Sequence, residues 1–193
     1  AVDKPVYIET SHVFCKGFVE PLLELGFRPD LIILRRPHSE VARSSLELAI
    51  VPGRTPKGFQ WNVSPDDPGV LPLPGWQDLH DYQLCYWYCL EIERRSQEYG
   101  KQFRMLGTRV TETSLHDITT IRGFRKVVRE LELPDPGLYQ WFRLFFKSKV
   151  VVNRQREHKR SYAVQIPSAD ERQELTEDLL RRIPDARQYI YEG

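Results

Sequence analysis

Two short apolar segments, each followed by a helical pattern, occupy the first 50 residues and constrain the fold most strongly. Residues 5–8 predict one strand. Residues 31–34 predict a second, and their unbroken apolar run is typical of a strand covered on both faces. Helical spacing predicts one helix over residues 16–25 and another that begins at Pro37. This alternation of strands and helices favours an α/β fold with a parallel sheet.

The composition is that of a soluble globular protein of 193 residues, the size of one domain. Hydrophobic residues make up 40% and charged residues 28%, which excludes a disordered or fibrous chain. The net charge of +1 is too balanced for a broad basic face, so we expect no nucleic-acid partner and only a local basic site. No apolar run approaches the ~20 residues that span a membrane, and no signal peptide opens the chain, which predicts a cytoplasmic protein unless an anchor lies upstream.

The cysteines and histidines offer little sign of a metal or redox centre. Three cysteines without regular spacing do not form a disulfide framework. Cys85 and Cys89 are four residues apart in an aromatic helical pattern, which favours buried thiols over a metal or redox pair. His38, His80 and His116 have no paired spacing with other ligands, so we expect no metal site.

The amino-acid composition changes over residues 51–78. This segment is rich in prolines and glycines and also contains Trp61 and Trp76. A loop of this length inside a compact domain is typical of a functional lid or an ordered excursion. We expect five further elements: an aromatic helix over residues 79–99, a weak strand over 103–106, a helix opened by a Ser114-x-x-Asp117 box, an aromatic helix over 139–146, and a last helix opened by a Ser168-x-x-Glu171 capping box.

The residues after the second predicted strand form a candidate anion site. In open α/β sheets, ligands bind at the carboxyl ends of parallel strands, and anions bind at the N-termini of the helices that follow. Arg35 and Arg36 lie at such a strand end and offer planar forks of donors that match phosphate oxygens. Ser44 follows Arg36 by eight residues on the next predicted helix. Alternatively, the arginines are solvated or pair with Glu40 and Asp30.

Two residues after the first predicted strand are candidate bases. Glu9 follows that strand directly and is placed to take a proton from a bound hydroxyl. His12 could do the same, since an imidazole titrates closer to neutral pH. Alternatively, Glu9 pairs with a neighbouring arginine and His12 is a surface residue.

A basic stretch over residues 154–160 is a third candidate. It contains four cations, one acid and one histidine within seven residues, including Arg154, Arg156 and Lys159. Such a stretch could close over a phosphorylated ligand, or it could form an exposed turn.

Taken together, these segments resemble the sulfotransferase family, whose members transfer a sulfuryl group from 3′-phosphoadenosine-5′-phosphosulfate (PAPS) to an acceptor hydroxyl or amine. The residues that carry the resemblance are Tyr7-Ile8-Glu9-Thr10-Ser11-His12, Leu31-Ile32-Ile33-Leu34-Arg35-Arg36-Pro37 and Val41-Ala42-Arg43-Ser44. The resemblance is specific over residues 6–50 and diffuse beyond them. It implies a three-layer parallel sheet flanked by helices, with P-loop nucleoside-triphosphate-hydrolase-like topology, in one domain over residues 1–193 with a loop insertion at 51–78.

The resemblance also implies how the cofactor binds. In that family an arginine at a strand end, often in an Arg-x-Pro turn, and a serine about eight residues later hold the 3′-phosphate of PAPS. The serine spacing implies Arg36 with Ser44, whereas the proline spacing fits Arg35; we favour Arg36 with Ser44. The family also covers the cofactor with a late basic loop, and the resemblance implies the same role for three residues: Arg154, Arg156 and Lys159.

The catalytic base of the family follows the preceding strand. It is a glutamate that opens a Glu-x-Ser segment in many carbohydrate-modifying members and a histidine in the cytosolic ones, which implies Glu9 first and His12 second. Residues 111–115 loosely resemble the family's strand-ending Tyr-Glu-Asp-Leu segment. The acceptor would be a small molecule or a carbohydrate, with the segment around Trp61 and Trp76 as a natural acceptor wall.

The chain departs from the family at its start. The family's first strand and phosphate loop, which cradles the 5′-phosphosulfate, have no counterpart, because no Gly-x-x-x-x-Gly-Lys-like segment is present. We expect that strand and loop upstream of residue 1, so that the chain is an N-terminally incomplete fragment. Two functions follow: a sulfotransferase that is complete only with upstream sequence, or a non-catalytic sulfotransferase-like binding module.

Overall fold

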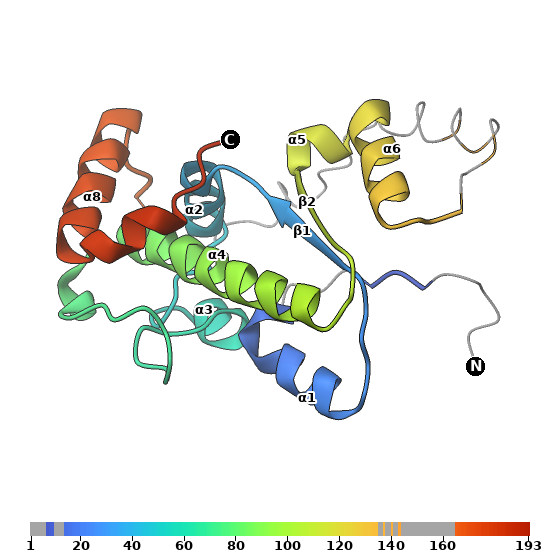
Figure 1. Ribbon diagram of the computed structural model, residues 1–193. Coiled ribbons are helices and arrows are strands. Elements are labelled where there is room, and N and C mark those ends of the chain that lie inside the picture. Colours follow the sequence, from blue (N-terminus) through green and yellow to red (C-terminus); the bar gives the residue numbers. More distant parts are fainter. Residues whose placement is uncertain (1–6, 10–13, 135–136, 138–139, 141–142, 144–164) are drawn as a thin grey trace. The chain divides into compact units, whose positions relative to one another are not determined.

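The computed structural model describes residues 7–9, 14–134, 137, 140, 143 and 165–193 (Figure 1). The chain divides into two compact units. The first comprises Ala1–Arg35 and Glu98–Arg154, and the second comprises Arg36–Gln97 and Gln155–Gly193. The predicted helix over 139–146 and the basic stretch over 154–160 lie almost entirely outside the described residues.

The first unit contains a parallel pair of strands, β1 (Leu31–Arg35) and β2 (Val110–Ser114), which lie side by side in Figure 1. Their register places Leu31 opposite Val110 and Arg35 opposite Ser114, so both strands end at the same edge of the sheet. The strand predicted over residues 31–34 is confirmed. The pair fits a parallel sheet, and the full three-layer architecture stays a prediction.

The described elements cover one face of β1 more fully than the other. On the covered face, Leu31 packs with Phe103 from the end of helix α4 (Asp81–Met105) in a small core. On the opposite face, Ile32 is 38% exposed and Leu34 is 50% exposed. Helices α5 (Leu115–Ile118) and α6 (Ile121–Glu130) contact β2 rather than β1, which leaves these two side chains uncovered by the described residues. The prediction of a strand buried on both faces is therefore wrong for this part of the chain.

The N-terminal segments differ from the predicted strand and helix. Tyr7 and Ile8, the described end of the predicted strand, have no regular secondary structure and are exposed. They pair with neither described strand, and a strand needs such a partner. The predicted helix begins late, as α1 (Val19–Glu24), after a π-helical turn η1 (Phe14–Phe18). Gly17, inside η1, has φ of 93°, a left-handed conformation that an α-helix cannot contain, so the regular helix begins only after it.

Two helix starts in the first unit are set by side-chain caps. The Ser114 hydroxyl accepts a hydrogen bond from the Asp117 N–H and caps the short α5. Thr120 then caps α6 in the same way through the Gly123 N–H. The single helix predicted after Ser114 is thus two helices. The strand predicted over 103–106 is wrong, because α4 continues to Met105 and buries Phe103.

The second unit is helical and is built around the first part of α4. The other elements are α2 (His38–Glu47), α3 (Pro56–Trp61), the 3-10 turns η2 (Trp76–Asp78) and η4 (Pro184–Tyr189), and α8 (Ala169–Arg182). Fully buried Tyr82, Tyr86 and Trp87 from α4 form its core with Leu46 of α2 and Leu179 of α8. The helix predicted over residues 79–99 is thus present in α4, and three of its aromatic side chains pack in the core.

The two cysteines of α4 are buried, as the sequence predicts. Burial raises the pKa of the Cys89 thiol to about 12 and that of the Cys85 thiol well above its usual range. Both thiols therefore stay protonated and unreactive at neutral pH.

Among the described helices, none is long and apolar enough to cross a bilayer.

The Pro/Gly-rich segment over residues 51–78 is an ordered excursion. The Thr55 side chain caps α3 by accepting from the Gly58 N–H at 3.1 Å. The Trp76 indole donates to Asp66 at 2.8 Å, and the Arg54 guanidinium bonds the Gln77 carbonyl at 2.6 Å. These contacts hold the excursion in one conformation.

Candidate functional site

The start of α2 carries the residues predicted to bind an anion. Pro37 is the N-cap residue and lies two residues after the last residue of β1, so the helix begins at His38. The Arg36 guanidinium bonds the Glu40 carboxylate at 3.1 Å. Ser44 lies one turn beyond Glu40, on the same side of α2. The Arg36 side chain therefore reaches along the side of the helix that carries Ser44.

Ser44 is placed to add a second donor on that side. It is half-buried, and within the described part of the chain its hydroxyl has no hydrogen-bond partner. The neighbouring Arg43 instead pairs with Glu47 at 3.4 Å. Arg36 and Ser44 thus provide a guanidinium fork and a hydroxyl that fit phosphate oxygens, with Glu40 as the present partner of the guanidinium.

The N-terminus of α2 is less open than the sequence predicts. The His38 N–H donates to the Tyr191 carbonyl at 3.0 Å, and the Tyr191 N–H donates back to His38 Nδ1 at 3.4 Å. The Tyr86 hydroxyl donates to Glu192 at 2.8 Å; burial, then this bond, raises the pKa of Tyr86. The first N–H group of the helix, that of His38, is therefore already bonded and is not available to an anion.

Arg35, in the first unit, has a different role from Arg36. Its guanidinium bonds the Glu112 carboxylate on β2 at 2.5 Å, and Arg104 from α4 bonds the other carboxylate oxygen at 2.5 Å. Asp30, the alternative partner for the arginines, instead accepts from Arg109 at 3.1 Å. Arg35, at the carboxyl end of β1, is therefore linked to the middle of β2. The cluster of Arg35, Arg104 and Glu112 keeps a net positive charge.

The stability of the first unit should depend on the ionisation of Glu112. Hydrogen bonds from Arg35, then from Arg104, lower the pKa of Glu112 from its ordinary 4.5. A carboxylate with a lowered pKa stabilises the fold above its ordinary pKa, and this contribution disappears as the pH falls through the lowered value. We expect urea titrations to give Glu112→Gln a deficit in unfolding free energy that is constant above about pH 5 and shrinks steadily toward pH 3. A deficit independent of pH would contradict this.

The candidate bases are only partly described. Glu9 is exposed, and its carboxylate accepts a hydrogen bond from the Tyr7 hydroxyl at 2.5 Å, which raises the pKa of Tyr7. Among the residues that the structure describes in the first unit, Tyr7 rather than an arginine is the partner of Glu9. His12 lies outside the described residues, as do Arg154, Arg156 and Lys159. Glu9 belongs to the first unit, whereas Arg36 and Ser44 belong to the second.

The second unit contains further candidate ligand-binding features, namely two exposed aromatic side chains and one hollow. On α3, Phe59 is 64% exposed and Trp61 is 40% exposed. A hollow of about 500 Å³ lies beside α8 and is lined by His80, Glu171 and Asp178 among others. None of the predicted site residues lines that hollow, and two of its carboxylates already bond Ser168 and Gln83.

Sequence reasoning missed two of the residues that define this region. Glu112 and Arg104 were not predicted as site residues, although both bond in the same cluster as Arg35. The sequence could have indicated Glu112 as a site residue, because it lies within the segment that resembles the family's strand-ending Tyr-Glu-Asp-Leu. Arg104 gave no signal, since its position at the end of α4 depends on a helix longer than the predicted one.

Comparisons with known proteins leave the function to be inferred from the chain itself. No protein-family model matches the chain, and neither does any curated protein or any solved structure.

Proposed function

We propose that this chain forms part of a PAPS-dependent sulfotransferase. Arg36 and Ser44 would bind the 3′-phosphate of the cofactor, and Glu9 would be the general base toward the hydroxyl or amine of a small molecule or carbohydrate. One observation carries the proposal: Arg36 reaches the side of α2 that holds Ser44, directly after a parallel strand. Open α/β sheets bind anionic ligands at this place.

The different surroundings of the two arginines support Arg36 as the phosphate ligand. The Arg35 side chain is 16% exposed and bonds a carboxylate on the neighbouring strand, whereas the Arg36 side chain is 39% exposed. The bond from Arg36 to Glu40 is an exposed pair four residues apart, a kind worth about 0.3–0.5 kcal/mol. A phosphate group can displace so weak a partner, because it offers bidentate charge-assisted bonds.

The proposed reaction requires the protein mainly to bind and orient the reactants, and little covalent chemistry of its own. PAPS, when bound, supplies the sulfuryl group. Glu9 would hold the proton that the acceptor loses as its oxygen or nitrogen bonds to sulfur, and the hydrogen bond from Tyr7 orients that carboxylate. Arg36 and Ser44 would hold the departing bisphosphate, so that positioning and charge stabilisation provide the rate. The exposed rings of Phe59 and Trp61 suit stacking on a carbohydrate acceptor.

Calorimetry with adenosine 3′,5′-bisphosphate tests the proposal. We expect Arg36→Gln to weaken binding about tenfold to hundredfold, since a hydrogen bond to a charged group contributes about 1.5–3 kcal/mol. We expect Glu40→Gln to strengthen binding several-fold, because it removes both a competitor for Arg36 and a like charge beside the phosphate. The opposite directions expected for these two partners distinguish a site from a surface that merely attracts anions.

Arg43→Gln is the matched control. It removes the same charge from within α2 itself, close to Arg36 in the sequence, but Arg43 bonds Glu47 and not Glu40. We expect its affinity to match that of the wild-type protein. Equal losses for Arg36→Gln and Arg43→Gln, or a wild-type protein that does not bind the bisphosphate, would overturn the proposal.

A further inference from the structure

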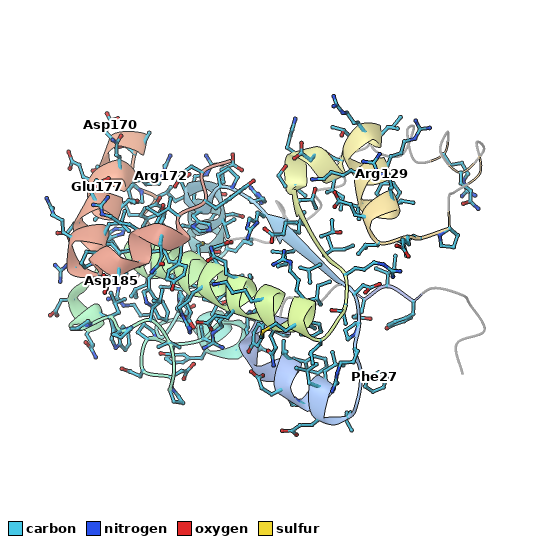
Figure 2. All side chains as sticks on the ribbon, viewed as in Figure 1. Phe27, Arg129, Asp170, Arg172, Glu177 and Asp185 are labelled. Carbon is cyan, nitrogen blue, oxygen red and sulfur yellow. The ribbon has the colours of Figure 1, made fainter. Side chains whose placement is uncertain are left out.

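Helix α6 divides into an apolar face and a basic face. Gly123, Val127 and Val128 are buried. The opposite face carries four exposed cations at positions i, i+3, i+4 and i+7, which is one row along a helix: Arg122, Arg125, Lys126 and Arg129. Figure 2 shows the side chains of α6 and labels Arg129 among them. At 1.5 Å per residue the row is about 10 Å long.

The charge of this row is local. Among the ten residues of α6, Glu130 is the one acid, and it lies 3.8 Å from Lys126. The whole chain has a formal net charge of only +1, so the row stands out against a balanced background. The sequence predicts that any basic site is local, and α6 is such a site in the described part of the chain.

The residue types in the row favour some classes of anionic partner over others. Three of its four cations are arginines, whose planar forks match sulfate and carboxylate groups. Val127 and Val128, on the apolar face of α6, are buried in their own unit and are therefore not available to insert into a membrane. The basic face carries no aromatic side chain on which bases could stack, and a formal net charge of +1 does not favour the broad basic surface of a duplex binder.

We infer that the basic face of α6 is a docking surface for an acidic polysaccharide, a linear chain that repeats sulfate or carboxylate groups along its length. Such a chain can lie along the row and meet several guanidinium groups in succession. Docking itself follows from α6 alone. That the docked polysaccharide is also the acceptor rests on the proposed function, and it would narrow the acceptor class to acidic carbohydrates.

Binding of fluorescently labelled heparin, followed by anisotropy over a range of salt concentrations, tests this surface. The test variant combines Arg122→Gln, Arg125→Gln and Arg129→Gln. We expect it to bind heparin about tenfold or more weakly than the wild-type protein. We also expect the magnitude of the slope of log affinity against log salt to fall by about 2 to 3. Each guanidinium contact that is lost leaves the counterions of that sulfate or carboxylate in place, so fewer counterions are released on binding.

The control variant removes the same charge elsewhere. It combines Arg181→Gln, Arg182→Gln and Arg187→Gln, three exposed arginines that each pair with a carboxylate of α8. We expect it to bind heparin as the wild-type protein does. Equal weakening by both variants would overturn the inference, since it would show a general response to net charge. Tighter binding of a duplex DNA than of heparin, or equal binding of neutral dextran, would overturn it too.

Adenosine 3′,5′-bisphosphate separates this inference from the proposed function. We expect the α6 variant to keep wild-type affinity for the bisphosphate, because Arg36 and Ser44 are intact in it. If the wild-type protein binds heparin through α6 but does not bind the bisphosphate, the proposed function fails and the docking surface stands. If it binds the bisphosphate and its heparin affinity is unchanged in the α6 variant, the docking surface fails and the proposed function stands.

Discussion

Replacing Glu91 with glutamine is expected to lower the free energy of unfolding by about 3 kcal/mol or more, since it breaks a buried ion pair by removing one partner. Glu91 is fully buried on α4. One carboxylate oxygen accepts from the Leu71 N–H at 3.0 Å and from Arg94 at 2.9 Å, and the other accepts from both Arg94 and Arg95. The carboxylate thus fastens the Pro/Gly-rich excursion to α4.

The loss should be large because the amide cannot replace the carboxylate. Glutamine has the same shape but no charge, and its NH₂ group would face donors from Arg94 and Arg95. Both guanidinium groups are mostly buried, so neither regains full hydration when its partner is neutral. Arg94 also bonds the Gly69 carbonyl at 2.8 Å, so the excursion would loosen at two points.

Urea titrations followed by tryptophan fluorescence measure the effect, since Trp61 and Trp76 lie in the excursion. Glu47→Gln is the control, because Glu47 forms an exposed pair with Arg43 on α2. Such pairs contribute less than about 1 kcal/mol. If Glu91→Gln and Glu47→Gln cost the same, the buried carboxylate does not hold the excursion.

The contacts that the sequence predicts well are those between residues only a few positions apart in the chain. The Ser168-x-x-Glu171 capping box forms with both of its reciprocal bonds, because its partners are three residues apart. Arg36 meets Glu40 four residues away, one of the two alternatives considered for it. Spacing fixes such contacts before any tertiary structure exists, so a reader of the sequence can anticipate them.

What the sequence does not predict depends on distant segments. Arg35 bonds Glu112, 77 residues away, and this pairing follows from the register of two parallel strands rather than from spacing. The partial cover of the start of α2 by Tyr191 depends on a contact across 153 residues. Phe103 illustrates a related ambiguity, because a four-residue stretch of three apolar residues and Arg104 fits a strand or the end of a helix equally well.

The two arginines show how this affects the candidate site. From the sequence they are adjacent and chemically identical, and only the resemblance to a family distinguishes them. In the structure one of them bonds a carboxylate on the next strand and the other bonds a weak local partner on α2. The distinction between a residue that joins strands and a residue available to a ligand therefore comes from their partners.

Replacing Gly58 with alanine is expected to lower the free energy of unfolding by about 3 kcal/mol, the upper part of the range for overpacking. A Cβ atom at this position would lie 1.8 Å from the Val51 carbonyl oxygen. That oxygen accepts from the Arg54 and Thr55 N–H groups, both at 3.2 Å, and Thr55 caps the helix through Gly58. The oxygen cannot move away without opening the turn that starts α3. Alanine usually favours a helix over glycine by about 1 kcal/mol, which is too little to offset the clash.

Gly100→Ala on α4 is the matched control for this prediction. A Cβ atom there would lie 3.2 Å from the tip of the Ile33 side chain, which can rotate, whereas the atom beside Gly58 belongs to the backbone. We expect Gly100→Ala to change the unfolding free energy by less than about 1 kcal/mol, because the helical gain and the small contact offset each other. Urea titrations followed by fluorescence and by circular dichroism should give both values. A small effect at Gly58, or losses of equal size at the two glycines, would show that the turn at Val51 yields to a methyl group.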